Sequence, residues 1–144
     1  NYNMFAYVDG DFLNRAIDHV RGGGNPKALK EAGIVPDMMK RGAVRSVFDG
    51  RHVFTRYFSP KQHNRPESLE ALYALNDVEL YDRESDPLEL RNLAARKGES
   101  AELVLAMNAR LNRLLDAEVG EDRGQMLPGG ADGGWEVTAE TMAP

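Results

Sequence analysis

The sequence predicts an α+β fold in which a small antiparallel sheet packs against a long C-terminal helix. Two segments rich in β-branched and aromatic residues flank Asp49-Gly50, as the arms of a β-hairpin do, and a third strand is expected at residues 78–82. Residues 100–119 carry apolar residues at helical spacing. The strands precede this helix without the regular strand–helix alternation of a parallel sheet, so an antiparallel sheet is expected.

Residues 1–40 are predicted to form a helical lead-in segment. A short apolar run at residues 5–8 suits a strand or the end of one. Asp11 then suits a helix N-cap, and apolar residues recur at helical spacing up to a run of three glycines that ends the helix. Asn25-Pro26 opens a second short helix, because Asn is a good cap and Pro fits the first turn.

The hairpin is predicted to pair residues 43–48 with residues 51–58 through a two-residue type I′ turn at Asp49-Gly50. In this register Phe48 faces Arg51. Both faces of the hairpin then carry apolar residues, whereas a hairpin that met water on one side would alternate more cleanly. We therefore expect cover on both faces, with one side supplied by a body outside this chain.

A short helix over residues 66–75 and a turn at Asn76-Asp77 are predicted to lead into the third strand at residues 78–82. Asp86-Pro87 then breaks the strand, because proline donates no ladder hydrogen bond. Three leucines are expected to pin the following loop onto the core: Leu88, Leu90 and Leu93.

The helix over residues 100–119 is predicted to cover the sheet with one apolar stripe, with Asn108 mostly off that stripe, and to stop at Gly120. A partner helix is the alternative target for the stripe. Residues 121–144 are rich in Gly, Asp and Pro and are predicted to be an extended tail, with Trp135 as an aromatic anchor for another subunit or domain. A loosely docked tail is the alternative. The stripe consists of Leu103, Val104, Met107, Leu111, Leu114 and Leu115.

Composition excludes several classes of protein. The net charge of −5 argues against a nucleic-acid partner, because affinity for a phosphate backbone comes from clustered Lys and Arg. No apolar run approaches the roughly 20 residues that span a bilayer. The absence of cysteine excludes disulfides, thiolate metal sites and a Cys nucleophile. The proportions of apolar and charged residues are those of a soluble globular protein. The sequence does not decide between the cytoplasm and the periplasm.

Residues that could carry chemistry are few. Arg45, His52 and Arg56 are expected on one face of the hairpin, where a small basic cluster could line a pocket for an anionic ester. The alternative is that these groups pair with carboxylates elsewhere in the protein. The acidic run from Asp82 to Glu89 lacks the glycine of a calcium-binding EF-hand loop, and no serine lies in a G-x-S-x-G elbow. No catalytic, cofactor-binding or metal-binding residue is therefore assigned within this chain.

Two stretches of the chain resemble the C-terminal region of the sulfatase family. Residues 79–94 read E-L-Y-D-R-E-S-D-P-L-E-L-R-N-L-A, which is similar to the family's E-L-Y-D strand running into a D-P-x-E-x-x-N-L-A turn. Residues 41–54 are similar to its R-G-x-R strand and D-G-R-Y-K-F/Y hairpin, with His52 and Val53 where that family often has Tyr and Lys. The resemblance covers about residues 41–120.

The resemblance implies that residues 41–120 are a C-terminal subdomain docked on a catalytic domain outside this chain. That domain would hydrolyse sulfate esters, or related phosphate or phosphonate esters, with a formylglycine nucleophile and a divalent metal, usually calcium. The C/S-x-P-x-R motif that supplies the nucleophile does not occur here, so this chain alone is expected to be inactive. The expected partners are the sulfatase catalytic domain and a second copy of the chain, the latter through the tail. The alternative is a free-standing α+β interaction module without enzymatic activity.

Overall fold

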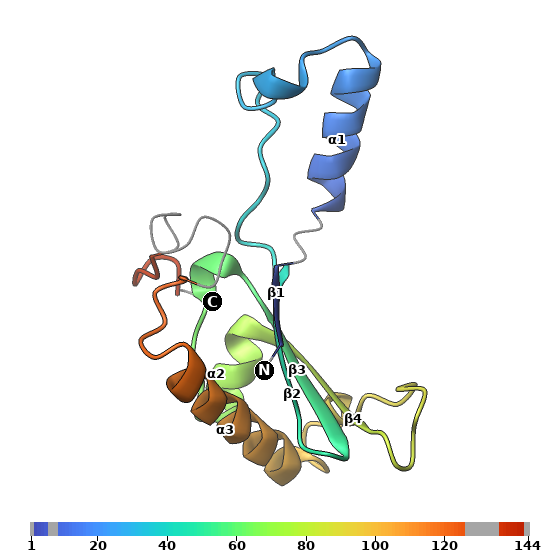
Figure 1. Ribbon diagram of the computed structural model, residues 1–144, viewed down its shortest axis with the longest axis vertical. Helices are drawn as coiled ribbons and strands as arrows, with labels where there is room; N and C mark the ends of the chain where they lie inside the picture. The colour runs from blue at the N-terminus through green and yellow to red at the C-terminus, as the bar shows by residue number, and fades with distance from the viewer. Residues whose placement is uncertain (1, 6–8, 126–135, 143–144) are drawn as a thin grey trace.

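The computed structural model describes residues 2–5, 9–125 and 136–142, and its sheet has the strand order β1-β2-β3-β4 with every neighbouring pair antiparallel (Figure 1). Helix α3 packs on one face of this sheet, which confirms the predicted α+β class. Strand β1 is an addition to the three predicted strands, and residues 6–8 of the predicted apolar run lie outside the described residues. The bounds are β1 Tyr2–Phe5, β2 Ala43–Phe48, β3 His52–Phe58, β4 Asn76–Asp82 and α3 Ala101–Glu118.

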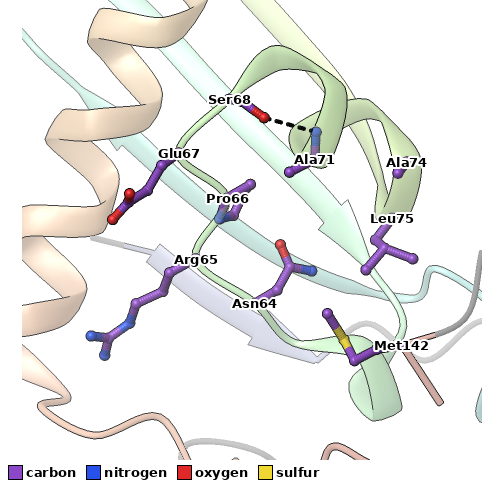
Figure 2. Close-up of a pocket in the computed structure, with 9 residues that line it drawn as sticks. All are labelled: Asn64, Arg65, Pro66, Glu67, Ser68, Ala71, Ala74, Leu75 and Met142. Atoms are coloured by element: carbon purple, nitrogen blue, oxygen red, sulfur yellow. Dashed lines mark hydrogen bonds between the residues drawn. The ribbon is translucent and has the colours of Figure 1, made fainter. Parts of the chain in front are cut away.

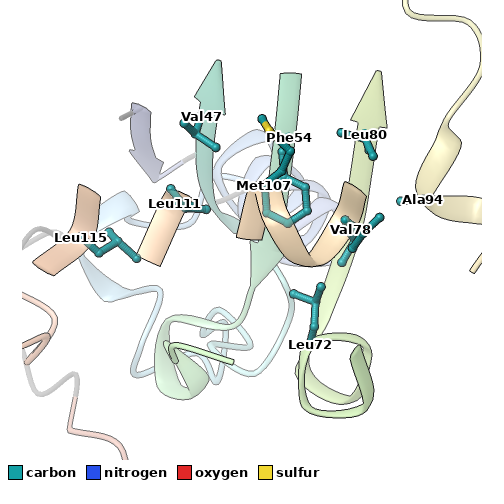
Figure 3. Packing of buried hydrophobic residues seen from close by; sticks show 10 residues of the cluster. Val47, Phe54, Leu72, Val78, Leu80, Ala94, Met107, Leu111 and Leu115 are labelled. Carbon is teal, nitrogen blue, oxygen red and sulfur yellow. The ribbon is translucent and has the colours of Figure 1, made fainter. Parts of the chain in front are cut away.

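The hydrophobic core lies between α3 and the inner face of the sheet, which is the face that carries Phe54 and Leu80 (Figure 3). The predicted stripe of α3 supplies the opposite side of this core, and Leu72 of helix α2 (Leu69–Leu75) closes one end. The prediction that α3 covers the sheet is therefore confirmed. The buried cluster contains Val47, Phe54, Leu72, Val78, Leu80, Ala94, Val104, Met107, Leu111 and Leu115.

The opposite face of β2, β3 and β4, which we call the outer face, carries five apolar or aromatic residues and four polar ones. Helices α2 and α3 both lie on the inner side, and no described helix covers the outer face (Figure 1). Phe48 is 54% exposed there. The expectation that a body outside the chain covers one face stays a prediction, and it concerns this face. The outer face consists of Val44, Ser46, Phe48, Val53, Thr55, Tyr57, Asp77, Glu79 and Tyr81.

The predicted register of the hairpin is wrong by two residues. Phe48 pairs with Val53, and the two turn residues are Gly50 and Arg51, which places a glycine of φ +109° at the first central position. The cause is Asp49, whose Oδ1 accepts the backbone N–H groups of Arg51 at 2.8 Å and His52 at 2.6 Å. These hydrogen bonds, that of His52 first, lower the pKa of Asp49 to about 2. Because a shift of two residues preserves side-chain alternation, the predicted faces are still correct.

The lead-in segment forms an arm that leaves the sheet after β1 and returns before β2. Its helix α1 (Gly10–Arg21) is capped by Asp9, which accepts the N–H groups of Asp11 and Phe12 at 3.2 Å, so the predicted cap at Asp11 is wrong by two positions. The predicted glycine run does end this helix. The second predicted helix is reduced to the 3₁₀ turn η1 (Pro26–Ala28).

The segment before β4 also differs from the prediction. Helix α2 begins three residues later than expected, because Ser68 caps it by accepting the N–H of Ala71 at 3.2 Å. The predicted turn at Asn76-Asp77 is wrong, since both residues already belong to β4 and pair with β3. The chain therefore passes from helix to strand without an intervening loop.

Helix α3 ends as predicted, with Gly120 at φ +73° donating its N–H to the carbonyl of Leu115 at 3.0 Å. The structure differs from the prediction at Asn108, which is buried on the inner side of the helix. None of the helices in the described part of the chain has the length and apolar character that crossing a bilayer requires.

Candidate functional site

Asp82, at the end of β4, holds the hairpin and the following turn together. Arg51 donates to its carboxylate from Nε at 2.9 Å and from Nη2 at 2.5 Å. The backbone N–H of Glu84 and the hydroxyl of Ser85 donate to the same carboxylate at 3.1 and 3.0 Å. The hydrogen bond from Arg51 is the main reason that the pKa of Asp82 lies well below its usual range. This carboxylate is therefore committed to structure.

Asn92 completes the strand–turn segment by bonding to the free edge of β4. Its Oδ1 accepts the N–H of Leu80 at 3.0 Å, and its Nδ2 donates to the carbonyl of Val78 at 3.0 Å. The same Oδ1 accepts the N–H of Ala94 at 2.9 Å, which caps the 3₁₀ turn η3 (Leu93–Ala95). One carboxamide thus supplies the donor and the acceptor that a neighbouring strand would have supplied.

The turn between these two residues points its leucines outward. Asp86 Oδ2 accepts the N–H of Arg91 at 2.8 Å, and Glu89 adopts φ +55°, an uncommon conformation for a residue other than glycine. Leu88 and Leu90 are 77% and 78% exposed, so the prediction that they pin the loop to the core is wrong. Leu93 does pack against the core, as predicted.

Replacing Asn92 with Ala tests its structural role. The variant leaves the edge groups of β4 without their partners, so we expect a loss of about 1–3 kcal/mol in the free energy of unfolding, measured by urea denaturation. Leu88→Ala is the matched control, because it removes an exposed side chain from the same segment, and its expected change is below about 0.5 kcal/mol. Equal losses in the two variants would contradict the assigned role.

Arg45 and Arg56 lie directly opposite each other on β2 and β3, on the inner face, and each is 1% exposed. The guanidinium of Arg45 makes a two-pronged ion pair with Asp122, in which Nη1 donates to Oδ2 and Nη2 donates to Oδ1 at 3.2 Å. It also lies 5.2 Å from the centre of the Phe58 ring. Arg45 is thus enclosed by a counterion and an aromatic face.

Arg56 has neutral partners. Its Nη1 donates to the Oδ1 atoms of Asn108 and Asn112 at 3.0 Å each, and both amides in turn donate to the carbonyl of Pro66, at 2.7 and 2.9 Å. Burial, assisted by the nearby charge of Arg45, lowers the pKa of Arg56 to about 9. The two asparagines, one helical turn apart on α3, therefore disperse a buried charge.

His52 does not join the two arginines. It lies at the turn end of β3, opposite Asp82, and Phe54 separates it from Arg56 along the same face. Its Nδ1 is 3.2 Å from Asp49 Oδ2. The structure thus brings together two of the three predicted pocket residues and engages both in buried contacts. For Arg45 the carboxylate partner comes from this chain.

Asp122, just beyond α3, is the residue of this cluster that the sequence did not reveal. Its Oδ1 lies 3.5 Å from Nδ1 of His63, in addition to its pair with Arg45. Burial would raise the pKa of Asp122, but hydrogen bonds from His63 and Arg45 outweigh burial and hold it well below its usual range. The first residues of the predicted tail are therefore docked, whereas Trp135 lies outside the described residues.

A groove of about 560 Å³ runs beside α2, and none of Arg45, His52 and Arg56 lines it (Figure 2). Ser68, the hydroxyl-bearing residue in its wall, is occupied in capping α2. Across residues 9–125 and 136–142 there is no group of three or more His, Asp or Glu side chains that could hold a metal ion. The groove is lined by Asn64, Arg65, Pro66, Glu67, Ser68, Ala71, Ala74, Leu75 and Met142.

Comparisons with protein-family models, with curated proteins and with solved structures find no match for this chain. The function is therefore inferred from the sequence and from the geometry of the structure. It defines a small α+β domain in which the polar residues of the strand–turn segment and of the arginine cluster stabilise the fold.

Proposed function

We propose that this chain is the C-terminal subdomain of a sulfatase-type hydrolase and that it supports a catalytic domain outside the chain. The observation that carries the proposal is the strand–turn segment of residues 79–94, which resembles that family over its whole length. Within the segment, Asp82 and Asp86 accept backbone N–H groups of the turn, and Asn92 accepts the N–H of Leu80 in β4. These three side chains hold the turn and the edge of β4 in place, which suits a supporting subdomain.

Two further observations favour the proposal that this chain supports a separate catalytic domain. The arginines that could have met an anionic ester are buried against Asp122, Asn108 and Asn112. On the outer face of the sheet, which no described helix covers, Phe48 is 54% exposed. In this proposal the nucleophile and its calcium ion belong to the catalytic domain, and the full enzyme hydrolyses sulfate esters.

A free-standing interaction module is the second candidate, and the exposed Leu88 and Leu90 favour it. The turn that presents them is held by Asp86 and by Arg91, whose Nη2 donates to the carbonyl of Ser85 at 3.1 Å. Large exposed apolar side chains on a well-bonded turn suit contact with another protein.

The coding region upstream of Asn1 separates the two candidates. A C/S-x-P-x-R motif in the same reading frame is the expected result, and a start codon close to Asn1 would overturn the sulfatase proposal. In parallel, the chain alone should hydrolyse no aryl sulfate, whereas the complete open reading frame should. Turnover by the isolated chain would contradict its supporting role.

A further inference from the structure

The turn after β4 presents the two most exposed large apolar side chains in the described part of the chain. Leu88 and Leu90 are 77% and 78% exposed, whereas the other large apolar side chains described are at most 54% exposed. The turn projects away from helices α2 and α3 (Figure 1). Single exposed apolar residues are common on protein surfaces, but two such residues on one projecting turn suit contact with a partner.

Hydrogen bonds fix the path of the backbone through this turn. Asp86 donates its N–H to the carbonyl of Asp82 at 2.8 Å, and its own carbonyl accepts the N–H of Glu89 at 3.0 Å. The carboxylate of Asp86 accepts the N–H of Arg91 at 2.8 Å. Between the two leucines, Glu89 is held at φ +55°, which is costly for a residue other than glycine. Because the turn is already ordered, docking on a partner requires little further loss of loop entropy.

Charged pairs lie beside the two leucines. Arg83 Nε is 3.4 Å from Glu89 Oε1, and Arg51 Nη1 is 3.1 Å from Glu84 Oε2. The N–H of Arg83 also donates to the carbonyl of Arg51 at 3.0 Å, which ties the turn to the tip of the hairpin, next to the exposed Phe48. Apolar side chains with charged groups at their margin are typical of the centre and rim of a protein–protein contact.

The small size of this contact indicates what kind of partner it takes. Burying both leucines would remove on the order of 200 Å² of surface from this chain, and on the order of 400 Å² with the partner's share. A specific interface between separate molecules needs about 1,000 Å² or more. A second copy of the chain that docked through this turn alone would therefore dissociate. A domain of the same polypeptide is present at a roughly millimolar effective concentration, so a small contact is enough to hold it.

We propose that Leu88 and Leu90 insert into an apolar pocket of the catalytic domain and thereby dock this subdomain on it. The inference rests on the proposed function, which places that domain upstream on the same polypeptide. The two leucines are the apolar anchor of the contact, and the bonded turn holds them in place before docking.

Thiol labelling measures whether a partner covers the turn. The chain has no cysteine, so Leu88→Cys gives it a single thiol, whose labelling is followed by mass spectrometry of the peptide that contains residue 88. We expect this thiol to react about tenfold more slowly in the complete polypeptide than in the isolated chain. Glu99→Cys is the matched control, since the side chain of Glu99 is 75% exposed outside the turn and should react equally fast in both. Equal rates for Leu88→Cys in the two proteins overturn the proposal.

The double variant Leu88→Asp with Leu90→Asp tests whether the contact stabilises the complete polypeptide. Its half-life on heating should shorten by about tenfold, whereas the isolated chain should keep its denaturant midpoint because both side chains are exposed there. An unchanged half-life of the complete polypeptide overturns the docking contact.

Aryl sulfate turnover by the complete polypeptide separates this inference from the proposed function. Turnover together with a fully reactive Leu88→Cys thiol overturns the docking contact alone. A protected thiol without turnover overturns the sulfatase assignment and leaves the docking contact supported.

Discussion

Asp122→Asn is expected to lower the free energy of unfolding by about 3–5 kcal/mol, a large part of the 5–15 kcal/mol typical of a small domain. The substitution keeps the shape of the side chain and removes its charge. Arg45 is then left 1% exposed without its counterion, and His63 loses the charge of its neighbour. Urea denaturation at neutral pH, followed by circular dichroism, measures the loss.

The double variant Arg45→Met with Asp122→Leu is the control. Removing both charges leaves no unpaired ion, so the double variant should lose much less stability than Asp122→Asn. If the double variant loses as much as the single one, shape and not charge accounts for the effect.

The Arg45–Asp122 ion pair also determines how the stability of the protein changes with pH. The pKa of Asp122 is held below its ordinary value of 3.8, so the pair stabilises the protein above that pH and its contribution is lost as the pH falls through the pKa of the folded state. The difference in stability between wild type and Asp122→Asn should therefore shrink below pH 3.8. A difference that stays constant down to acid unfolding would contradict the ion pair.

Asn108→Leu is expected to destabilise the protein by about 2–4 kcal/mol, although it adds an apolar side chain to a buried position. Arg56 would lose one of its two acceptors, and the carbonyl of Pro66 would lose a donor. Because burial already lowers the pKa of Arg56 to about 9, its charge has little solvent to compensate for the loss.

Asn112→Leu is the matched control, since it removes the same two kinds of hydrogen bond one helical turn further along α3. Asn112 is only partly buried, so water can replace its contacts, and the expected loss is about 1 kcal/mol. Both values come from denaturant midpoints at equal slope. A stable Asn108→Leu would show that Arg56 does not depend on this acceptor.

The sequence predicts which side chains share a face of the hairpin, but it does not predict the register of the two strands. Side chains alternate along a strand, so the positions of Phe54 and Val53 on opposite faces follow from their order alone. The register depends on the turn, and the carboxylate of Asp49 moved the turn to Gly50 and Arg51. The preference of Asp-Gly for the two central positions of a turn does not take into account that the Asp49 side chain can accept backbone N–H groups.

Predicting burial from side-chain polarity fails at three positions. Leu88 and Leu90 are apolar but exposed, and Asn108 is polar but buried. The leucines point outward because Asp82, Asp86 and Asn92 determine the path of the turn, and that path leaves no core beneath them. Asn108 is buried because a buried guanidinium on β3 needs an acceptor. Its spacing of four residues from Asn112 is the sequence signal that could have pointed to this pair.

The sequence by itself determined the α+β class, the existence of β2, β3, β4 and α3, and the glycine that ends α3. These features follow from periodicity and from backbone preferences within a few neighbouring residues. Only the tertiary structure decided the hairpin register, the outward leucines, the exposed stripe of α1 and the burial of Arg45 against Asp122. That last pair joins residues 77 positions apart, and the energy of a charge depends on the groups that surround it after folding.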